Sequence, residues 1–231
     1  MKNTVAVIVA HPDDEVLGCG GTIAKHVENG DLVHVLIMAE GITSRNEKRD
    51  VTNCEDLLES LHMTAKKANE HIGSSSLKLL NLPDNRMDSI DLLDIIKDIE
   101  LFIDEYRPDI IYTHYSSDVN IDHQLVYDAV ITATRPVPGQ VVTTILCFEI
   151  VSSTEWQPSC GRFPFSPNWY IELTKNQLQK KILALEEYGS EMRDFPHARS
   201  IENIKLLAKW RGANVGVNYA ESFVLARNIL K

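Results

Sequence analysis

The 231-residue sequence has few basic residues and no long apolar run, and each shortage excludes a class of protein. Lys and Arg number 23 against 33 Asp and Glu, which gives a formal net charge of −10. Binding to the phosphate backbone of nucleic acid needs a basic surface, and so does attraction to an anionic membrane, so we expect neither partner. No stretch approaches the roughly 18 consecutive apolar residues of a transmembrane helix, so no membrane span is expected.

Cysteine is also scarce, and the four cysteines form no CxxC or CxxH pair. A chain of this length can bury a core without disulfides, so we expect free thiols in a reducing compartment. The N-terminal apolar run, residues 5–10, is shorter than the roughly 7–15 residues of a secretory signal, and charged residues follow it directly. The sequence therefore predicts a cytoplasmic protein.

Short β-branched runs alternate with stretches of helical spacing through the first 150 residues. We expect strands over 5–10, 32–39, 77–80, 109–113 and 142–150, and helices over 18–29, 47–72, 90–106 and 121–134. Such alternation is typical of βαβ units. It predicts a Rossmann-like α/β fold, in which a mostly parallel, doubly wound sheet has helices on both faces.

The remainder of the chain has a different pattern. We expect a long loop over 152–168, helices over 175–188 and 200–209, and either a strand or a helix over 220–230. No linker-like composition separates this part from what precedes it. The sequence therefore predicts one domain over residues 1–231, with a Rossmann-like core in 1–150 and a C-terminal elaboration in 151–231.

Two clusters of His and Asp follow the expected first and fourth strands. The HPDDE motif, His11 to Glu15, comes after the first strand, and the segment HYSSDVNIDH, residues 114–123, comes after the fourth. In open α/β sheets, ligands bind beyond the carboxyl ends of the strands, and these two strands are neighbours in the common strand orders. We therefore expect the clusters to face each other across one crevice.

Two imidazoles and a carboxylate are a common zinc ligand set. His11, Asp14 and His123 would supply it, with another divalent metal as an alternative. Asp13 would then be free to take a proton from metal-bound water, and the resulting hydroxide would attack a carbonyl carbon. An alternative stays open for the HPDDE motif by itself, which could form a solvated turn with Asp13 or Asp14 as the cap of the next helix.

The glycines of Gly18-Cys-Gly-Gly21 invite a comparison with phosphate-binding loops. Their spacing matches neither GxGxxG nor a Walker A motif. A dinucleotide-dependent oxidoreductase would need GxGxxG after the first strand, where the HPDDE motif stands instead. We expect these glycines to permit close helix packing behind the metal site.

Several motifs occur in order along nearly the whole chain. They are AHPDDE (10–15), GCGG (18–21), DIIYTH (109–114), NIDH (120–123), TRP (134–136), FPHARS (195–200), RG (211–212) and AESF (220–223). Together they resemble the N-acetylglucosaminyl-phosphatidylinositol de-N-acetylase family, also called PIG-L or LmbE-like. The HPDDE motif after a first strand, with a downstream Asp-His pair, is the most specific part of this resemblance.

The resemblance implies a Rossmann-like fold and zinc-dependent hydrolysis of an acetamide on an amino sugar. By position, the metal ligands implied are His11, Asp14 and His123. Asp13 matches the general base, and Asp122 matches a residue that orients neighbouring groups. Arg45, in the loop after the second strand, is implied to contact the substrate.

One position departs from the family pattern. Many members have a histidine three residues before the last ligand, where this chain has Asn120. Asparagine can donate a hydrogen bond to an oxyanion, but it cannot shuttle a proton at neutral pH. Either Asp13 returns the proton itself or another histidine serves, and the candidates are His114 and His197.

The sequence thus predicts a metal-dependent N-deacetylase whose partner is a small N-acetylated amino sugar or sugar conjugate. Two alternatives stay open. The same metal site could hydrolyse another amide, such as a formamide, or the chain could be a non-catalytic domain that binds a sugar or a nucleotide. The oligomeric state is also open, and a homo-oligomer is compatible with the sequence.

Overall fold

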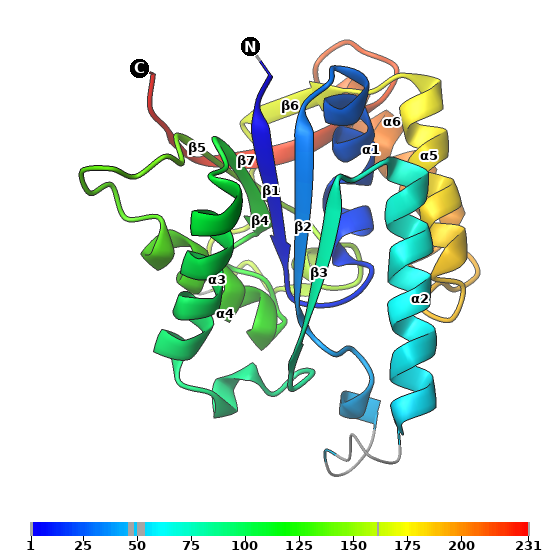
Figure 1. The fold of residues 1–231 in the computed structure, drawn as a ribbon. Helices are drawn as coiled ribbons and strands as arrows, with labels where there is room; N and C mark the ends of the chain where they lie inside the picture. Colours follow the sequence, from blue (N-terminus) through cyan, green and yellow to red (C-terminus); the bar gives the residue numbers. More distant parts are fainter. Residues whose placement is uncertain (1, 46–48, 50–53, 161, 231) are drawn as a thin grey trace.

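The computed structural model describes the chain except residues 1, 46–48, 50–53, 161 and 231. Among the described residues, seven strands form a sheet in the order β3-β2-β1-β4-β5-β7-β6 (Figure 1). The strands are β1 (Thr4–Val9), β2 (Leu32–Ala39), β3 (Ser76–Leu82), β4 (Ile110–His114), β5 (Thr144–Phe148), β6 (Trp169–Glu172) and β7 (Ala220–Asn228). The first five pair in parallel, and β7 is antiparallel to β5 and β6. This arrangement confirms the predicted fold class.

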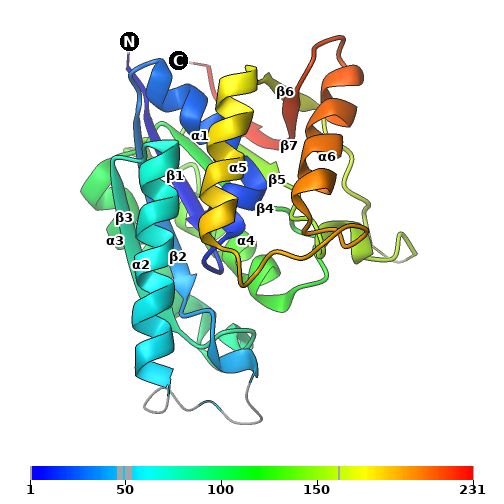
Figure 2. The same ribbon diagram turned by 90° about the vertical axis from the view of Figure 1, so that its right-hand side faces the viewer.

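Helices cover both faces of the sheet (Figure 1). They are α1 (Asp14–Glu28), α2 (Glu55–Ile72), α3 (Leu92–Tyr106), α4 (Ile121–Ala133), α5 (Lys175–Glu187) and α6 (Ile201–Ala213). One apolar cluster joins the sheet to α1, α2 and α5, and a second joins it to α3 and α4. Figure 2 shows α2, α5 and α6 in succession across the first of these faces.

Strand β1 is buried on both sides. Val5, Val7 and Val9 belong to one apolar cluster, while Ala6 and Ile8 belong to the other. This double burial explains why the strand is a continuous apolar run instead of an alternating one. Because β1 pairs with both β2 and β4, the strand order reverses beside it, at the position where ligands bind in sheets of this kind.

Four elements change or complete the sequence-based expectations. Strand β6 was not expected, and it forms by antiparallel pairing with β7, which no local pattern reveals. Residues 220–230, open between strand and helix, contain β7. Helix α1 begins at Asp14, four residues earlier than expected, whereas part of the helix expected over 47–72 lies outside the described residues. The single-domain organisation stays a prediction.

Helix α1 consists of two helical pieces joined at Cys19, whose backbone leaves the helical region (φ −149°, ψ 25°). After this break, the N–H groups of Gly21 and Thr22 donate to the Glu221 carboxylate over 3.1 and 2.7 Å. Lys181 of α5 forms a buried ion pair with the same carboxylate at 2.6 Å. A side chain of β7 therefore caps the second piece of α1, whose free N–H groups favour an anion.

The glycines in the first half of α1 allow the helix to approach its neighbours closely. A Cβ atom on Gly18 would lie 2.5 Å from the Phe148 ring, and one on Gly21 would lie 2.5 Å from the Leu173 side chain. These contacts confirm the packing interpretation of the GCGG motif. Within the described residues, we find no helix with the combined length and apolar character that crossing a membrane requires.

Replacing Gly18 by alanine should destabilise the fold. The Phe148 ring is fully buried, so it cannot move away from the new methyl group without disturbing the core. We expect the free energy of unfolding to fall by about 1–3 kcal/mol in urea denaturation. Gly189→Ala is the matched control, because its Cβ would lie 3.4 Å from the nearest heavy atom. Equal losses in the two variants would contradict the packing argument.

Candidate metal centre and active site

The HPDDE motif forms a tight turn between β1 and α1. Asp13 stands at the N-cap position with a left-handed backbone (φ 107°, ψ −28°), but its side chain makes no capping hydrogen bond. The Asp13 N–H instead donates to Oε2 of the buried Glu15 over 3.1 Å. A left-handed non-glycine residue costs about 1–3 kcal/mol, and such residues cluster at functional sites. The alternative in which Asp13 is only a helix cap is therefore not supported.

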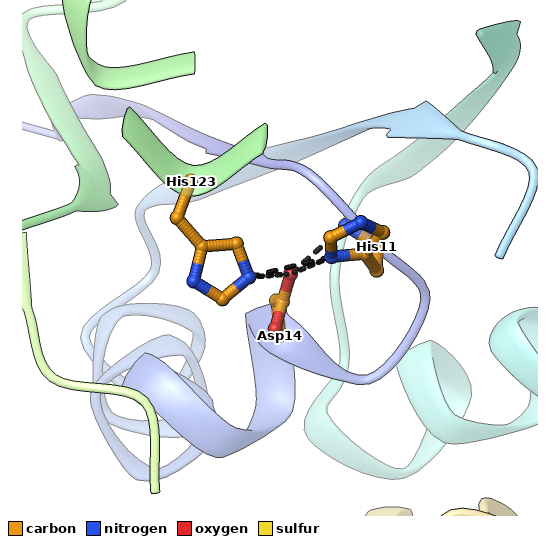
Figure 3. A group of neighbouring side chains, drawn as sticks. All are labelled: His11, Asp14 and His123. Carbon is orange, nitrogen blue, oxygen red and sulfur yellow. Dashed lines mark hydrogen bonds and ion pairs between the residues drawn. The ribbon is translucent and has the colours of Figure 1, made fainter. Parts of the chain in front are cut away.

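Three side chains from the two predicted clusters meet at the carboxyl edge of the sheet (Figure 3). Asp14 Oδ2 lies 3.2 Å from His11 Nδ1 and 3.3 Å from His123 Nε2. The two histidine nitrogens are themselves 3.3 Å apart. The three atoms thus form a nearly equilateral triangle, and the crevice expected from the sequence brings these residues together.

This triangle has the dimensions of a metal site. A tetrahedral zinc ion with ligand distances of about 2.0–2.2 Å separates its ligand atoms by about 3.3–3.6 Å. The donor set of two imidazoles and one carboxylate suits zinc as well. Oδ1 of Asp14 is buried and has no hydrogen-bond partner among the described residues. These residues therefore fit a divalent metal ion.

The second nitrogen of His11 faces a carboxylate. Asp122 Oδ2 lies 3.0 Å from His11 Nε2. The same carboxylate accepts hydrogen bonds from the backbone N–H groups of Asn85 at 2.7 Å and Met87 at 3.0 Å, which hold it in place. A carboxylate in this position orients the imidazole and leaves the other nitrogen, Nδ1, for a metal. This geometry agrees with the orienting role that the resemblance implied for Asp122.

His123 has an equivalent partner that the sequence analysis did not single out. Asp118 Oδ1 lies 3.2 Å from His123 Nδ1, which leaves Nε2 of that ring for a metal. The Asp118 carboxylate is held in turn by the hydroxyls of Ser153 and Thr154, the latter at 2.6 Å. The sequence does place Asp118 five residues before His123 in the same segment. It does not show that the Asp118 carboxylate contacts the His123 ring.

His11, Asp84 and Asp122 form a second group that is close enough to hold a cation. The oxygens of these two carboxylates already accept hydrogen bonds. Asp84 accepts from the Ser44 hydroxyl at 2.6 Å and from the Asn85 amide at 3.0 Å. Since both carboxylates are satisfied without a metal, this group is better explained as support for His11.

The charges in the metal-ligand triangle depend on one another. Burial lowers the pKa of His123, but Asp14 and Asp118 outweigh that effect and raise it to about 9. Burial raises the pKa of Asp14, but His123 and His114 hold it well below its ordinary value. Protons therefore compensate the buried carboxylates when no cation is bound. A divalent ion would replace these protons, as is usual for sites built from imidazole and carboxylate.

Asp13 lies beside the metal-ligand triangle and is almost completely buried. Its Oδ2 accepts a hydrogen bond of 2.5 Å from Nη1 of Arg199, whereas its Oδ1 has no partner among the described residues. Burial raises the pKa of the Asp13 carboxyl well above its ordinary value, and Arg199 opposes part of that rise. The sequence analysis did not include Arg199 among the site residues. Its only signal was its place in the FPHARS segment.

A cavity of about 170 Å³ opens over these groups. It is many times larger than the roughly 10–15 Å³ that one water molecule needs. The side chains used in the argument that line it are His11, Asp13, Asn85, Asn120, His123 and Arg199. The two proposed histidine ligands and the proposed base therefore share one cavity, beside the buried Asp14.

Asn120 is the N-cap of α4. Its Oδ1 accepts a hydrogen bond from the Asp122 N–H at 2.8 Å, and its Nδ2 donates to Asn85 Oδ1 at 2.8 Å. An amide nitrogen has two N–H groups, so one remains for a molecule in the cavity. Its role as a donor to an oxyanion stays a prediction.

His114 does not suit the role of proton donor. The ring is fully buried, stacks on His123 with centroids 3.9 Å apart, and accepts the Ala10 N–H on Nε2 over 2.9 Å. It is not among the described residues that line the cavity. Burial, followed by the charge of His123, lowers the pKa of His114 well below its ordinary value. The structure places His114 as a buried ring packed behind His123, and its predicted catalytic role stays a prediction.

Of the two other predicted site residues, the structure describes the side chain of His197 but not that of Arg45. His197 is exposed and does not line it, since its Nδ1 accepts the Arg199 N–H over 3.0 Å and its ring meets the edge of Trp156. Its influence on the site is therefore indirect, through the segment that carries Arg199. The backbone of Arg45 belongs to a short 3₁₀ turn, Thr43–Arg45, but its side chain lies outside what the structure describes.

Two relatives are similar over much of their length. The uncharacterized deacetylase YaiS of Escherichia coli (strain K12) is 27% identical over 194 residues, which cover 82% of this chain and 92% of the relative. The probable N-acetyl-alpha-D-glucosaminyl L-malate deacetylase 2 of Bacillus cereus is 29% identical over 157 residues, which cover 67% of this chain and 71% of the relative.

Solved structures with the same fold include more than one kind of enzyme. The zinc-inhibited form of teicoplanin deacetylase Orf2 has a TM-score of 0.77 at 16% identity and covers 99% of this chain and 100% of its own. GalB, the 4-carboxy-2-hydroxymuconate hydratase from Pseudomonas putida KT2440, has a TM-score of 0.75 at 22% identity. The match covers 100% of this chain and 98% of the GalB chain. At such identities the likeness shows the fold alone.

The family comparison reaches further than the fold. A model described as PIG-L, GlcNAc-PI de-N-acetylase, matches residues 6–134, which is more than half of the chain. The matched region contains the HPDDE motif and the segment that ends in His123, so it includes all three corners of the metal-ligand triangle. The chain belongs to the PIG-L family of GlcNAc-PI de-N-acetylases.

Proposed function

We propose that this protein is a zinc-dependent hydrolase that removes the acetyl group from an N-acetylated amino sugar or sugar conjugate. The observation that carries the proposal is the convergence on one cavity of a metal-sized ligand triangle and the buried carboxylate of Asp13. Membership of a deacetylase family supports the reaction type. The name of the Bacillus cereus relative supports an acetylated glucosamine conjugate as the class of substrate.

His11 Nδ1, Asp14 Oδ2 and His123 Nε2 would hold the metal. A zinc ion, when bound, supplies Lewis-acid chemistry that acidifies water and polarises a carbonyl group. The chain's own contribution is to keep both imidazoles in the correct orientation through Asp118 and Asp122. Asp14, Asp118 and Asp122 are fully buried, and burial strengthens their electrostatic contacts with the imidazoles.

Asp13 would move the proton. Its carboxylate, which lines the cavity, would accept the proton of the attacking water and then return it to the nitrogen of the leaving amine. This single-carboxylate route is favoured over a second acid because His114 is buried and His197 is not among the described residues that line the cavity. The free N–H of Asn120 would donate to the carbonyl oxygen as negative charge develops on it.

Mass-spectrometric detection of acetate, with zinc supplied and a panel of chemically defined N-acetylated amino sugars, tests the reaction. We expect acetate and the free amine in equal amounts. Release of formate from N-formyl analogues without any acetate would indicate a different amide hydrolase. The absence of turnover with either panel would favour a non-catalytic binding domain.

Removal of the metal should abolish activity. We expect a chelator to eliminate acetate release and stoichiometric zinc to restore it, because the cavity has no other described group that could polarise the carbonyl as strongly. Elemental analysis of His123→Ala should show the loss of bound zinc. Full activity of the chelated protein, verified as metal-free, would contradict the metal assignment.

Asp13→Asn should remove the base and preserve the metal site. Asparagine retains the shape of the side chain but cannot accept a proton, so we expect kcat to fall by about 10²–10⁴-fold while the zinc content stays the same. Asp104→Asn is the control, since that carboxylate is exposed on α3. A kcat near that of the wild type in Asp13→Asn would exclude Asp13 as the base.

Asp118→Asn should weaken metal binding without removing a ligand. Loss of the carboxylate behind His123 is expected to raise the dissociation constant for zinc by about 10–100-fold. Competition with a fluorescent zinc chelator measures this change. Ser153→Ala is the control, because it removes a loop contact of Asp118 and leaves the His123 contact intact. Equal weakening in the two variants would assign the effect to the loop.

A further inference from the structure

We propose that Arg199 is a positioning residue that fixes the orientation of the Asp13 carboxylate. This inference rests on the proposed function, in which Asp13 is the base. Arg199 holds Oδ2, and Oδ1 is buried without a partner among the described residues. Arg199 lies outside residues 6–134, so the matched family model does not include this contact.

The contact restricts the one torsion that would otherwise exchange the two oxygens. Rotation about χ2 of an aspartate is broad, and a 180° turn swaps Oδ1 and Oδ2. The 2.5 Å charge-assisted hydrogen bond from Arg199 Nη1 to Oδ2 opposes that rotation in a buried setting. Oδ1 therefore keeps one orientation, and both residues line the cavity.

Arg199 is itself held at several points. Its Nε donates to the Ser152 hydroxyl over 2.7 Å, and its backbone N–H donates to His197 Nδ1 over 3.0 Å. Ser152 has a left-handed backbone (φ 66°), and its N–H donates to Glu155 Oε1 over 2.6 Å. The guanidinium is thus anchored to a fixed loop and cannot follow a rotating carboxylate.

The backbone of Asp13 is fixed from the opposite side. Its left-handed conformation and the hydrogen bond from its N–H to Glu15 hold the main chain. Glu15 is held in turn by the Tyr188 hydroxyl at 2.8 Å and the Asn69 amide at 3.0 Å. With the backbone held on one side and Oδ2 on the other, the position of Oδ1 has little remaining freedom.

A second ion pair provides a comparison for a purely structural role. Arg211 binds Glu149 through two hydrogen bonds of 2.8 and 2.6 Å, and both side chains are 16% exposed. Neither residue is among the described residues that line the metal cavity. Loss of this pair should therefore affect stability without affecting the reacting groups.

The test compares Arg199→Ala, Arg199→Lys and Arg211→Ala with zinc supplied. We expect kcat of Arg199→Ala to fall by about 10²-fold, the effect of misplacing a reacting group by about 1 Å. KM and zinc content should stay near the wild-type values. Added guanidinium, at concentrations too low to denature, should restore part of kcat in Arg199→Ala and none in Arg211→Ala. Arg199→Lys should retain partial activity, because its ammonium keeps the charge but loses the anchoring Nε.

Three results of these assays would overturn the proposal. They are wild-type kcat in Arg199→Ala, a raised KM with unchanged kcat, and a loss of kcat that follows the unfolded fraction measured by thermal denaturation. If the wild-type enzyme releases no acetate, the proposed function fails separately.

Crystal structures of the zinc-loaded wild type and Arg199→Lys then decide the positioning. We expect one Asp13 rotamer in the wild type and a rotated Asp13 carboxylate in Arg199→Lys. The same Asp13 conformation in both would refute the proposal.

Discussion

The pairing of β1 with β4 is the interaction on which the rest of the site depends. Their parallel register places Val7 opposite Tyr112, so both strands end at the same edge of the sheet. Ala10 extends the contact beyond the ladder, because its N–H donates to the ring of His114, 104 residues away. Both faces of β1 pack against helices, so the core that stabilises the sheet also determines where the metal ligands stand.

Burial of charge is the second constraint, because an unpaired buried charge costs several kcal/mol. In this site, the buried carboxylates have charged or hydrogen-bonding partners. Asp118 and Asp122 face imidazoles and accept hydrogen bonds from hydroxyl or backbone groups, and Asp13 faces Arg199. The Oδ1 atoms of Asp13 and Asp14 are the described carboxylate oxygens here that stay buried without a partner. Unsatisfied buried atoms call for an explanation, and for these two oxygens the proposed metal site and the proposed base supply one.

The family resemblance and the structure inform different parts of the mechanism. The de-N-acetylase model covers the HPDDE motif and the segment up to His123, and it therefore supports the reaction type. Asn120 departs from the family pattern, and the burial of His114 removes one of the histidines that could compensate. The proton is therefore assigned to Asp13 in the proposed mechanism. Its proposed positioning residue comes from the C-terminal part of the chain, which the fold alone does not connect to a reaction.

The sequence by itself determined the fold class, the position of both His/Asp clusters and the packing role of the glycines in α1. These follow from short-range signals, since strand periodicity, helix spacing and the HPDDE motif are each contained within a few residues. Only the tertiary structure decided that His114 is buried, that Asp118 stands behind His123 and that β6 joins the sheet. Only packing could bring Arg199 to Asp13, because the two lie 186 residues apart and neither has a local pattern that encodes the other. Distances between side chains on different elements depend on how those elements pack, and no periodicity in the sequence specifies that packing.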